Sequence, residues 1–118
     1  MLRQRMIDLQ LRTRNITDER VLTGMLSVPR HLFVPPDLVE RAYDDNPLSI
    51  GHGQTISQPY IVAAMAQAAL VKENDKVLEV GTGCGYSAAV LSTLAKSVVT
   101  SEIINELGNS AKDRSEER

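Results

Sequence analysis

A cluster of glycines directly follows a short apolar run and could bind a ligand through exposed backbone. Gly81-Thr82-Gly83-Cys84-Gly85 comes after Val77–Val80 and before a helical run that starts at Tyr86. A glycine-rich turn between a strand and a helix lets a ligand approach the backbone and directs N–H groups toward it. Tyr86 occupies the position of the last glycine in the dinucleotide pattern G-x-G-x-x-G, and no Gly-Lys-Ser/Thr sequence follows, which excludes a P-loop.

Two acids accompany this turn. Glu102 lies 21 residues after Gly81, close to the ~20-residue spacing at which an acid accepts from the hydroxyls of a ribose. Glu79 stands at the end of the apolar run before the turn. The pattern favours a ligand with a ribose but no pyrophosphate, such as S-adenosylmethionine, over NAD. The alternatives are that the glycines serve only the turn and helix packing, and that Glu102 is a solvated acid at a helix start.

The elements that position these residues form a βαβ unit. Val77–Val80 and Val98–Ser101 are rich in branched apolar residues and predict strands, and the small residues from Tyr86 to Ala95 predict a helix. A helical crossover makes the two strands parallel, with a right-handed connection. The sequence therefore predicts an α/β protein.

Helices are predicted on the N-terminal side. Leu2, Met6 and Leu9 share one face of an amphipathic helix over residues 2–14, and a second helix, capped by Asp18 or Thr17, runs to about Val28 before Pro29. Its predicted buried stripe is Val21, Leu22, Met25 and Leu26, and Asp37 is predicted to cap a short helix over 38–43. Helical spacing returns from Tyr60 to Val71, and Met25 and Met65 are predicted to be core residues. Between the short helix and this run, residues 44–59 show no hydrophobic periodicity and predict a functional loop.

The composition excludes several classes of protein. The chain has 118 residues, enough for one modest domain, and a formal net charge of −2, which argues against nucleic-acid binding by bulk charge. One cysteine excludes an intrachain disulfide, and two histidines with one cysteine are too few for the usual structural zinc site. No apolar run approaches the ~18 residues of a membrane span. We expect a cytoplasmic protein without a metal.

Three segments resemble the protein-L-isoaspartate O-methyltransferase family in sequence, order and spacing. They are VPRHLFVP (28–35), AYDDNPLSIGHGQTISQPYIVAAM (42–65) and VLEVGTGCGY (77–86), and the first two are more family-specific than the glycine turn. The resemblance, over residues 1–111, implies a Rossmann-like S-adenosylmethionine-dependent methyltransferase fold with N-terminal helices. It also implies methylation of the free carboxylate of L-isoaspartyl residues in damaged proteins, as a step in their repair, by a monomer.

The resemblance also implies site residues. The family's active-site serine corresponds to Ser57, which would orient the acceptor carboxylate by a hydrogen bond without acting as a nucleophile. Substrate contacts would come from Thr55, Ile56 and Ser57, and cofactor contacts from Gln54, Glu79, Val80, Gly81, Thr82, Gly83, Gly85, Glu102 and Ile103. From the residues alone, Ser-Gln-Pro is good helix-capping chemistry for Ser57, His52 is a structural hydrogen-bonding residue, and Cys84 is chosen for its small size.

The resemblance fades after Ala111, and the family's full domain is longer. We therefore expect a C-terminally truncated fold, with residues 1–58 forming the helical segment and the substrate loop, 59–111 the first βαβ half, and 112–118 a polar tail. A parallel sheet normally has its faces and edges covered, so we expect weak cofactor binding, poor turnover and association through the exposed sheet edge. The alternatives are a methyltransferase with a small-molecule acceptor, and a non-catalytic module of this fold that binds a partner.

Overall fold

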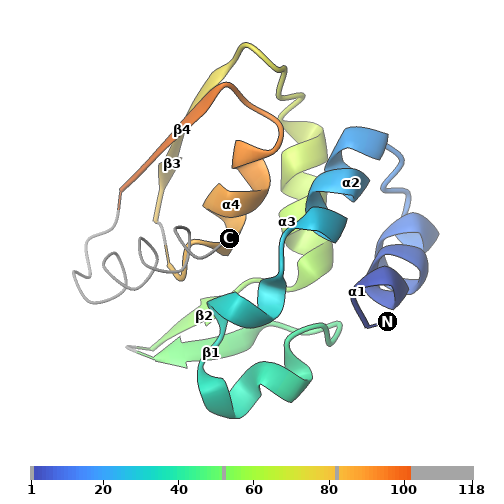
Figure 1. Ribbon diagram of the computed structural model, residues 1–118, viewed down its shortest axis with the longest axis vertical. Coiled ribbons are helices and arrows are strands. Elements are labelled where there is room, and N and C mark those ends of the chain that lie inside the picture. The colour runs from blue at the N-terminus through green and yellow to red at the C-terminus, as the bar shows by residue number, and fades with distance from the viewer. Residues whose placement is uncertain (1, 52, 82, 102–118) are drawn as a thin grey trace.

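The computed structural model describes residues 2–51, 53–81 and 83–101, and Figure 1 shows how their helices and strands are arranged. An N-terminal helical stretch is followed by a longer helix, two 3₁₀ turns, a β-hairpin, a second longer helix and a βαβ unit. In chain order the elements are α1 (Leu2–Arg5), η1 (Met6–Leu11), η2 (Arg12–Arg14), α2 (Glu19–Ser27), η3 (Arg30–Phe33), η4 (Pro36–Arg41), β1 (Leu48–Gly51), β2 (Gln54–Ile56), α3 (Pro59–Ala68), β3 (Lys76–Val80), α4 (Tyr86–Ser92) and β4 (Ser97–Ser101).

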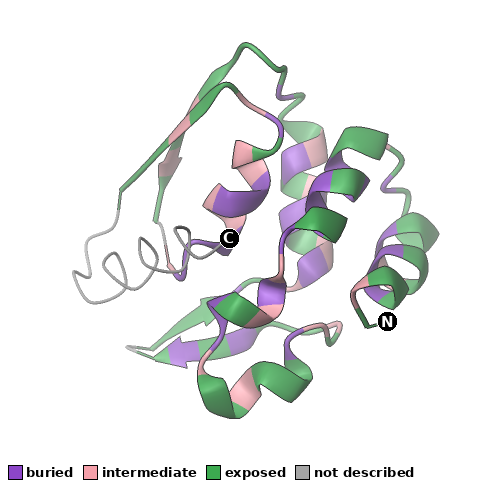
Figure 2. Ribbon diagram, in the orientation of Figure 1, coloured by how far each residue is buried: buried purple, intermediate pink, exposed green. Residues whose placement is uncertain are grey.

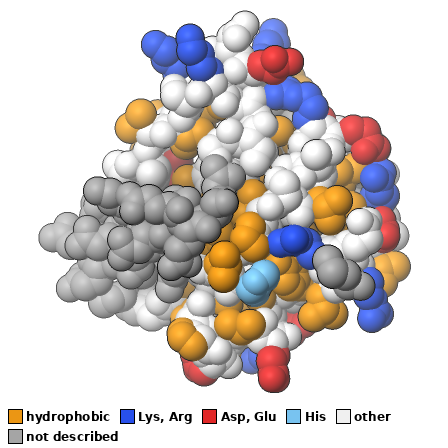
Figure 3. All heavy atoms as spheres, in the orientation of Figure 1, with side chains coloured by type: hydrophobic (Ala, Val, Ile, Leu, Met, Phe, Trp, Pro, Cys, Tyr) orange, Lys and Arg blue, Asp and Glu red, His pale blue; other side chains and the backbone are white. Residues whose placement is uncertain are grey.

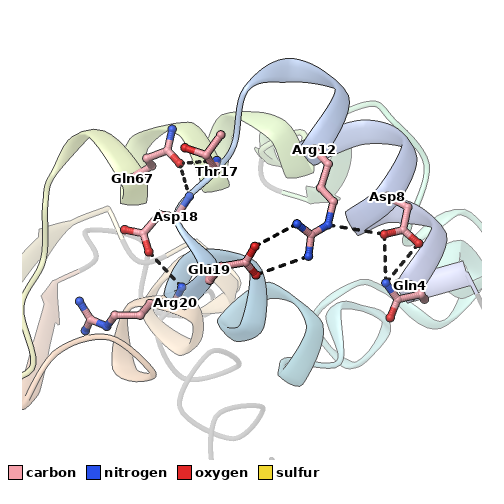
Figure 4. Close-up of polar contacts among 8 residues, drawn as sticks. All are labelled: Gln4, Asp8, Arg12, Thr17, Asp18, Glu19, Arg20 and Gln67. Atoms are coloured by element: carbon pink, nitrogen blue, oxygen red, sulfur yellow. Dashed lines mark hydrogen bonds and ion pairs between the residues drawn. The ribbon is translucent and has the colours of Figure 1, made fainter.

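The predicted helix break and cap before α2 are confirmed. The Asp18 carboxylate accepts a hydrogen bond from the backbone N–H of Arg20 at 2.9 Å, which satisfies one free donor of the first turn. The amide oxygen of Gln67, on α3, accepts from the backbone N–H groups of Thr17 and Asp18, both at 2.9 Å (Figure 4). These bonds fix the start of α2 against α3. The prediction of an Asp37 cap is wrong, because η4 begins at Pro36 without a side-chain cap.

The hydrophobic core lies between the N-terminal helices, α2, α3 and α4, with one edge against the hairpin (Figure 2). Val21, Leu22 and Met25 are buried in it as predicted. The helical stretch 2–14 buries a different stripe from the predicted one, because Leu2 and Leu9 are exposed and the buried residues are Met6, Ile7 and Leu11. Two further core predictions are wrong: Leu26 is exposed, and Met65, on α3, is 69% exposed.

The contact between α2 and α4 requires a glycine. A Cβ built on Gly24 would lie 2.4 Å from Oγ1 of Thr93, which no real Cβ tolerates without a shift of its neighbour. On the face seen in Figure 3, hydrophobic side chains gather in the middle, and most charged side chains lie toward the rim. In the part of the chain that the structure describes, no helix has the length and apolar character needed to cross a bilayer.

A β-hairpin replaces part of the predicted loop. β1 and β2 pair antiparallel, with Leu48 opposite Ile56 and Ser49 opposite Thr55, and the register shifts between Ser49 and Gly51. Gly51 and Gly53 have φ angles of +93° and +69°, a region that glycine adopts without strain. Leu48 and Ile56 are buried against the core, so the hairpin has one packed face.

The βαβ unit is confirmed. β3 and β4 are parallel and pair in register from Lys76 opposite Ser97 to Val80 opposite Ser101. Since side chains alternate along a strand, Val77 and Glu79 point to one face and Leu78 and Val80 to the other. α4 lies beside the first face (Figure 1). Among the described residues no helix covers the second face, on which Val80 is 81% exposed.

Candidate functional site

The glycine turn directs its backbone into open space. Gly81 has a φ of +87°, and no atom of the surrounding structure lies within 4 Å of the position that its Cβ would occupy. Its N–H donates to the carbonyl oxygen of Ser101 at 2.8 Å, which joins the turn to the end of β4. Gly85, with a φ of +92°, is the residue from which α4 begins. The turn therefore leaves room for a ligand while its own conformation is fixed at both ends.

A groove of about 320 Å³ lies between α3, β3 and α4, and its lining includes Val80 and Ser87, which come just before and just after the glycine turn in sequence. Ser57, from the segment before α3, and Glu79 and Val80, from β3, are among its lining residues. The Glu79 carboxylate accepts a hydrogen bond from the Thr100 hydroxyl on β4 at 2.8 Å, which fixes its orientation. The groove thus brings Ser57, the predicted active-site serine, to the same space as Glu79, one of the two predicted cofactor-binding acids.

The hairpin places Gln54, a predicted cofactor residue, and the predicted substrate residues Thr55 and Ile56. Gln54 and Thr55 are exposed, whereas the Ile56 side chain is buried in the core, so only its backbone could contact a substrate. The tip of β1 lies against the glycine turn, since Cδ1 of Ile50 is 3.8 Å from the position of a Cβ on Gly83. We call residues 54–58 the serine loop. The hairpin therefore places the tip of β1 at the glycine turn, and its second strand, β2, forms the first part of the serine loop.

Ser57 is not the helix cap that its local sequence suggests. The residue before α3 is Gln58, which makes no capping hydrogen bond, and Pro59 is the first helical residue. The Ser57 side chain is exposed and lines the groove. Its hydroxyl is therefore placed for an interaction in the groove rather than for capping.

Two polar anchors that sequence reasoning missed hold the serine loop. The carbonyl oxygen of Ser57 accepts from Nη2 of Arg30 at 2.9 Å, and Arg30 is fully buried. On the other side, Nε2 of Gln58 donates to the Asp45 carboxylate at 2.8 Å, and the same carboxylate accepts two hydrogen bonds from Arg14. The Arg14 and Gln58 hydrogen bonds, in that order, lower the pKa of Asp45 to about 2. The loop is thus held from both sides by charged groups.

Four residues of interest lie outside the described residues: His52, Thr82, Glu102 and Ile103. Ser101, which directly precedes Glu102, lies beside Gly81, and the two residues are joined by a backbone hydrogen bond. Cys84, in the glycine turn before α4, is buried. The roles of the cofactor acid Glu102 and of Ile103 therefore stay predictions.

The comparisons with known proteins bear on the whole chain. The family model of protein-L-isoaspartate(D-aspartate) O-methyltransferase matches residues 1–118. The chain belongs to this family. A protein-L-isoaspartate O-methyltransferase of Opitutus terrae is 58% identical over 109 residues, which are 92% of this chain and 47% of that protein. A second, of Picosynechococcus, is 54% identical over 98% of this chain and 52% of its own length.

Solved structures of protein-L-isoaspartate O-methyltransferases have the same fold. One such structure superimposes with a TM-score of 0.85 at 28% identity, over 98% of this chain and 38% of that one. A second, from Plasmodium falciparum and in complex with S-adenosyl-L-homocysteine, gives a TM-score of 0.77 at 26% identity, over 95% of this chain and 54% of that one. These likenesses confirm the predicted methyltransferase fold. The chain spans about half the length of the curated relatives it matches.

Proposed function

We propose that this chain provides the methyl-donor and acceptor-orienting half of an enzyme that methylates L-isoaspartyl residues in damaged proteins. The observation that carries the proposal is the groove that Ser57 and Glu79 both line, together with Val80 and Ser87 from either side of the glycine turn. Membership of the protein-L-isoaspartate O-methyltransferase family supports the choice of reaction. The partner is accordingly an isoaspartyl-containing protein or peptide, and we propose a cytoplasmic monomer that binds neither nucleic acid nor membrane.

The residues of the groove fit S-adenosylmethionine. The space in front of Gly81 would be filled by any other side chain, and it admits the close approach of a ligand to the backbone. Glu79 supplies a carboxylate beside that space, suited to the positively charged methionine part. We propose that Gln54, Val80 and residues 81–85 complete this contact, with Glu102 accepting from the ribose and Ile103 beside the adenine. The cofactor supplies a methyl group on a sulfonium, which is a good leaving group.

The chain's own residues have a positioning task in this reaction. An acceptor carboxylate is already ionised at neutral pH, so no base is needed to activate it. The Ser57 hydroxyl donates a hydrogen bond that orients one carboxylate oxygen, and Thr55, exposed on the same hairpin, is a second donor. Holding reacting groups in a near-attack arrangement can supply up to ~7–11 kcal/mol of a barrier. The fixed serine loop is suited to that task.

The test is methyl transfer from radiolabelled S-adenosylmethionine to an isoaspartyl peptide and to its aspartyl counterpart. Because the chain spans about half the length of its relatives, we expect slow turnover that is restricted to the isoaspartyl peptide. Ser57→Ala is expected to lower that turnover by ~10-fold or more, because it removes a positioned hydrogen bond. Equal labelling of both peptides, or labelling of a small-molecule acceptor alone, would contradict the proposed substrate.

A second candidate function is a non-catalytic module of this fold that binds a partner through its sheet. The observation that favours it is the face of the β3–β4 sheet that no described helix covers (the uncovered face), where Leu78, Val80 and Val99 are 69%, 81% and 64% exposed. Parallel sheets normally have both faces covered. Calorimetric titration with S-adenosylhomocysteine separates the two functions. A methyltransferase half binds the nucleoside, whereas a module that has only a partner-binding role shows no heat of binding.

A further inference from the structure

A fully buried arginine joins the two parts of the proposed site. Nε of Arg30 donates to the carbonyl oxygen of Ala42 at 2.6 Å, and Nη2 donates to the carbonyl oxygen of Ser57 at 2.9 Å. The guanidinium carbon lies 4.8 Å from the ring centroid of Tyr86, the first residue of α4 after the glycine turn. One side chain therefore contacts the end of η4, the serine loop and the start of the helix that the turn begins.

Burial of this charge needs a specific explanation. Arg30 is the one charged side chain in the core of the described residues, and its exposed fraction is 0%. Transfer of an ion from water to a protein interior is costly unless its hydrogen bonds are replaced. The guanidinium contacts two backbone carbonyl oxygens and an aromatic face, while Nη1 is buried without a hydrogen-bond partner among the described residues. An apolar residue in this space would leave the carbonyl oxygens of Ala42 and Ser57 without the donors that Arg30 supplies, which is costly for buried groups, so the charge is tied to the arrangement of these partners.

The geometry of the guanidinium defines that arrangement. Its donors form a rigid planar fork, so the carbonyl oxygens of Ala42 and Ser57 are held at fixed positions relative to each other. The plane contacts the ring of Tyr86, whose other neighbours are Phe33, in an edge-to-face pair at 5.7 Å, and the sulfur of Met25. Tyr86 is itself fully buried. The serine loop is therefore connected to the start of α4 through a ring that cannot move freely.

We propose that Arg30 is a positioning residue that holds the serine loop and the glycine turn in one fixed arrangement. Resting on the proposed function, this inference has a catalytic consequence. Ser57 orients the acceptor and the turn binds the donor, so the Arg30 guanidinium sets the alignment between them. Misplacement of reacting groups by about 1 Å can lower a rate by ~100-fold. Arg30 acts through Ser57 and Tyr86 and does not itself contact the reacting atoms.

The chain offers a control in Arg20, an exposed arginine with a similar pair of backbone acceptors. Its guanidinium also donates to two backbone carbonyl oxygens, those of Val71 at 2.7 Å and Leu94 at 2.6 Å, and it also joins separate elements. Neither of those carbonyls belongs to the serine loop or to the glycine turn. Arg20→Lys therefore reports what the loss of two arginine–carbonyl bonds does to the fold alone.

The experiment compares Arg30→Lys, Arg20→Lys and wild type by hydrogen exchange. Wild type is also measured at the urea concentration that lowers its free energy of unfolding to that of each variant, which gives a stability-matched reference. In Arg30→Lys we expect exchange in the hairpin and at the start of α4 to be at least ~10-fold faster than in the stability-matched wild type, because their shared contact is lost. Arg20→Lys is expected to match its reference in the hairpin and at the start of α4, because its carbonyl partners, Val71 and Leu94, lie elsewhere. Uniformly faster exchange in Arg30→Lys would overturn the proposal.

Two further measurements keep the result decisive. Where wild type transfers methyl, Arg30→Lys is expected to lower kcat by ~10–100-fold with a smaller change in KM for the peptide, since alignment rather than binding is lost. If wild type neither binds S-adenosylhomocysteine nor transfers methyl, the proposed function fails, while the exchange comparison still decides the role of Arg30. If Arg30→Lys does not fold, the test uses wild type alone. The proposal then requires that amides of the hairpin and of α4 exchange through one common opening. Exchange through two separate openings, with rates that differ by more than ~10-fold, would overturn the proposal.

Discussion

Protonation of Asp45 should release one side of the serine loop and destabilise the fold in acid. Its carboxylate accepts from Nη1 of Arg14 at 2.7 Å, from Nη2 of the same residue, and from Nε2 of Gln58 at 2.8 Å. Gln58 directly follows Ser57. These bonds favour the ionised carboxylate, and they hold the pKa of Asp45 at about 2, from an ordinary value of 3.8.

The magnitude follows from the difference between the folded and unfolded states. A carboxyl whose pKa falls from 3.8 to about 2 on folding would contribute at most ~2.4 kcal/mol. The Asp45 side chain is 34% exposed, and solvent screening reduces the contribution to ~1 kcal/mol. Because the folded pKa lies below the unfolded one, this contribution is fully present above about pH 4. It is lost as the pH falls toward about 2, since the unfolded chain then binds more protons.

The assay is urea unfolding of wild type, Asp45→Asn and Asp44→Asn at several pH values from about 7 to about 2. Asp45→Asn should be less stable than wild type by ~1 kcal/mol at neutral pH, and the difference should vanish near pH 2. Asp44→Asn is the matched control, because the Asp44 carboxylate makes an exposed ion pair with Arg41 at 3.7 Å. A constant difference between wild type and Asp45→Asn across this range would refute the reasoning.

Three other substitutions test separate parts of the structure. Gly24→Ala places a Cβ 2.4 Å from Oγ1 of Thr93 and should lower the free energy of unfolding in urea by ~1–3 kcal/mol. In a Thr93→Ala background the same substitution should be neutral or stabilising. An equal cost in both backgrounds would contradict the close contact. Gly81→Ala and Gly53→Ala both place a residue with a side chain at a positive backbone φ, which should lower the free energy of unfolding by ~1–2 kcal/mol. Only Gly81→Ala should weaken S-adenosylhomocysteine binding by ~10-fold or more in calorimetry. Val99→Lys, on the uncovered sheet face, should change stability by less than ~0.5 kcal/mol, and loss of an oligomer in sedimentation would favour the partner-binding function.

The βαβ unit could be predicted because each local signal agrees with the final structure. Val77–Val80 contains only residues that suit a strand apart from Glu79, and the glycines that follow permit the positive φ angles of the turn. The Asp18 cap is similarly local, since its partner is the N–H two residues along. Such features depend on short stretches of chain, so the sequence alone contains the information.

The hairpin and Arg30 could not be predicted because they depend on tertiary contacts. Gly51 and Gly53 interrupt the alternation of Leu48, Ile50 and Ile56, so the two short strands do not read as strands. Arg30 would ordinarily be placed at the surface, since arginine is rarely fully buried. Its only signal is its position inside the apolar segment VPRHLFVP. The partners that justify its burial come from three other parts of the chain.

The serine loop is organised by the N-terminal part of the chain rather than by the sheet. Arg30 holds the carbonyl of Ser57, and Arg14, through Asp45, holds the side chain of Gln58. Both arginines precede the loop in sequence and lie outside the β3–β4 sheet. The acceptor side of the proposed site is therefore already formed in residues whose contacts do not involve the uncovered sheet face. It follows that substitutions at the N-terminal anchors should alter the site even though they lie far from the glycine turn in sequence, whereas substitutions on the uncovered face should leave the serine loop in place.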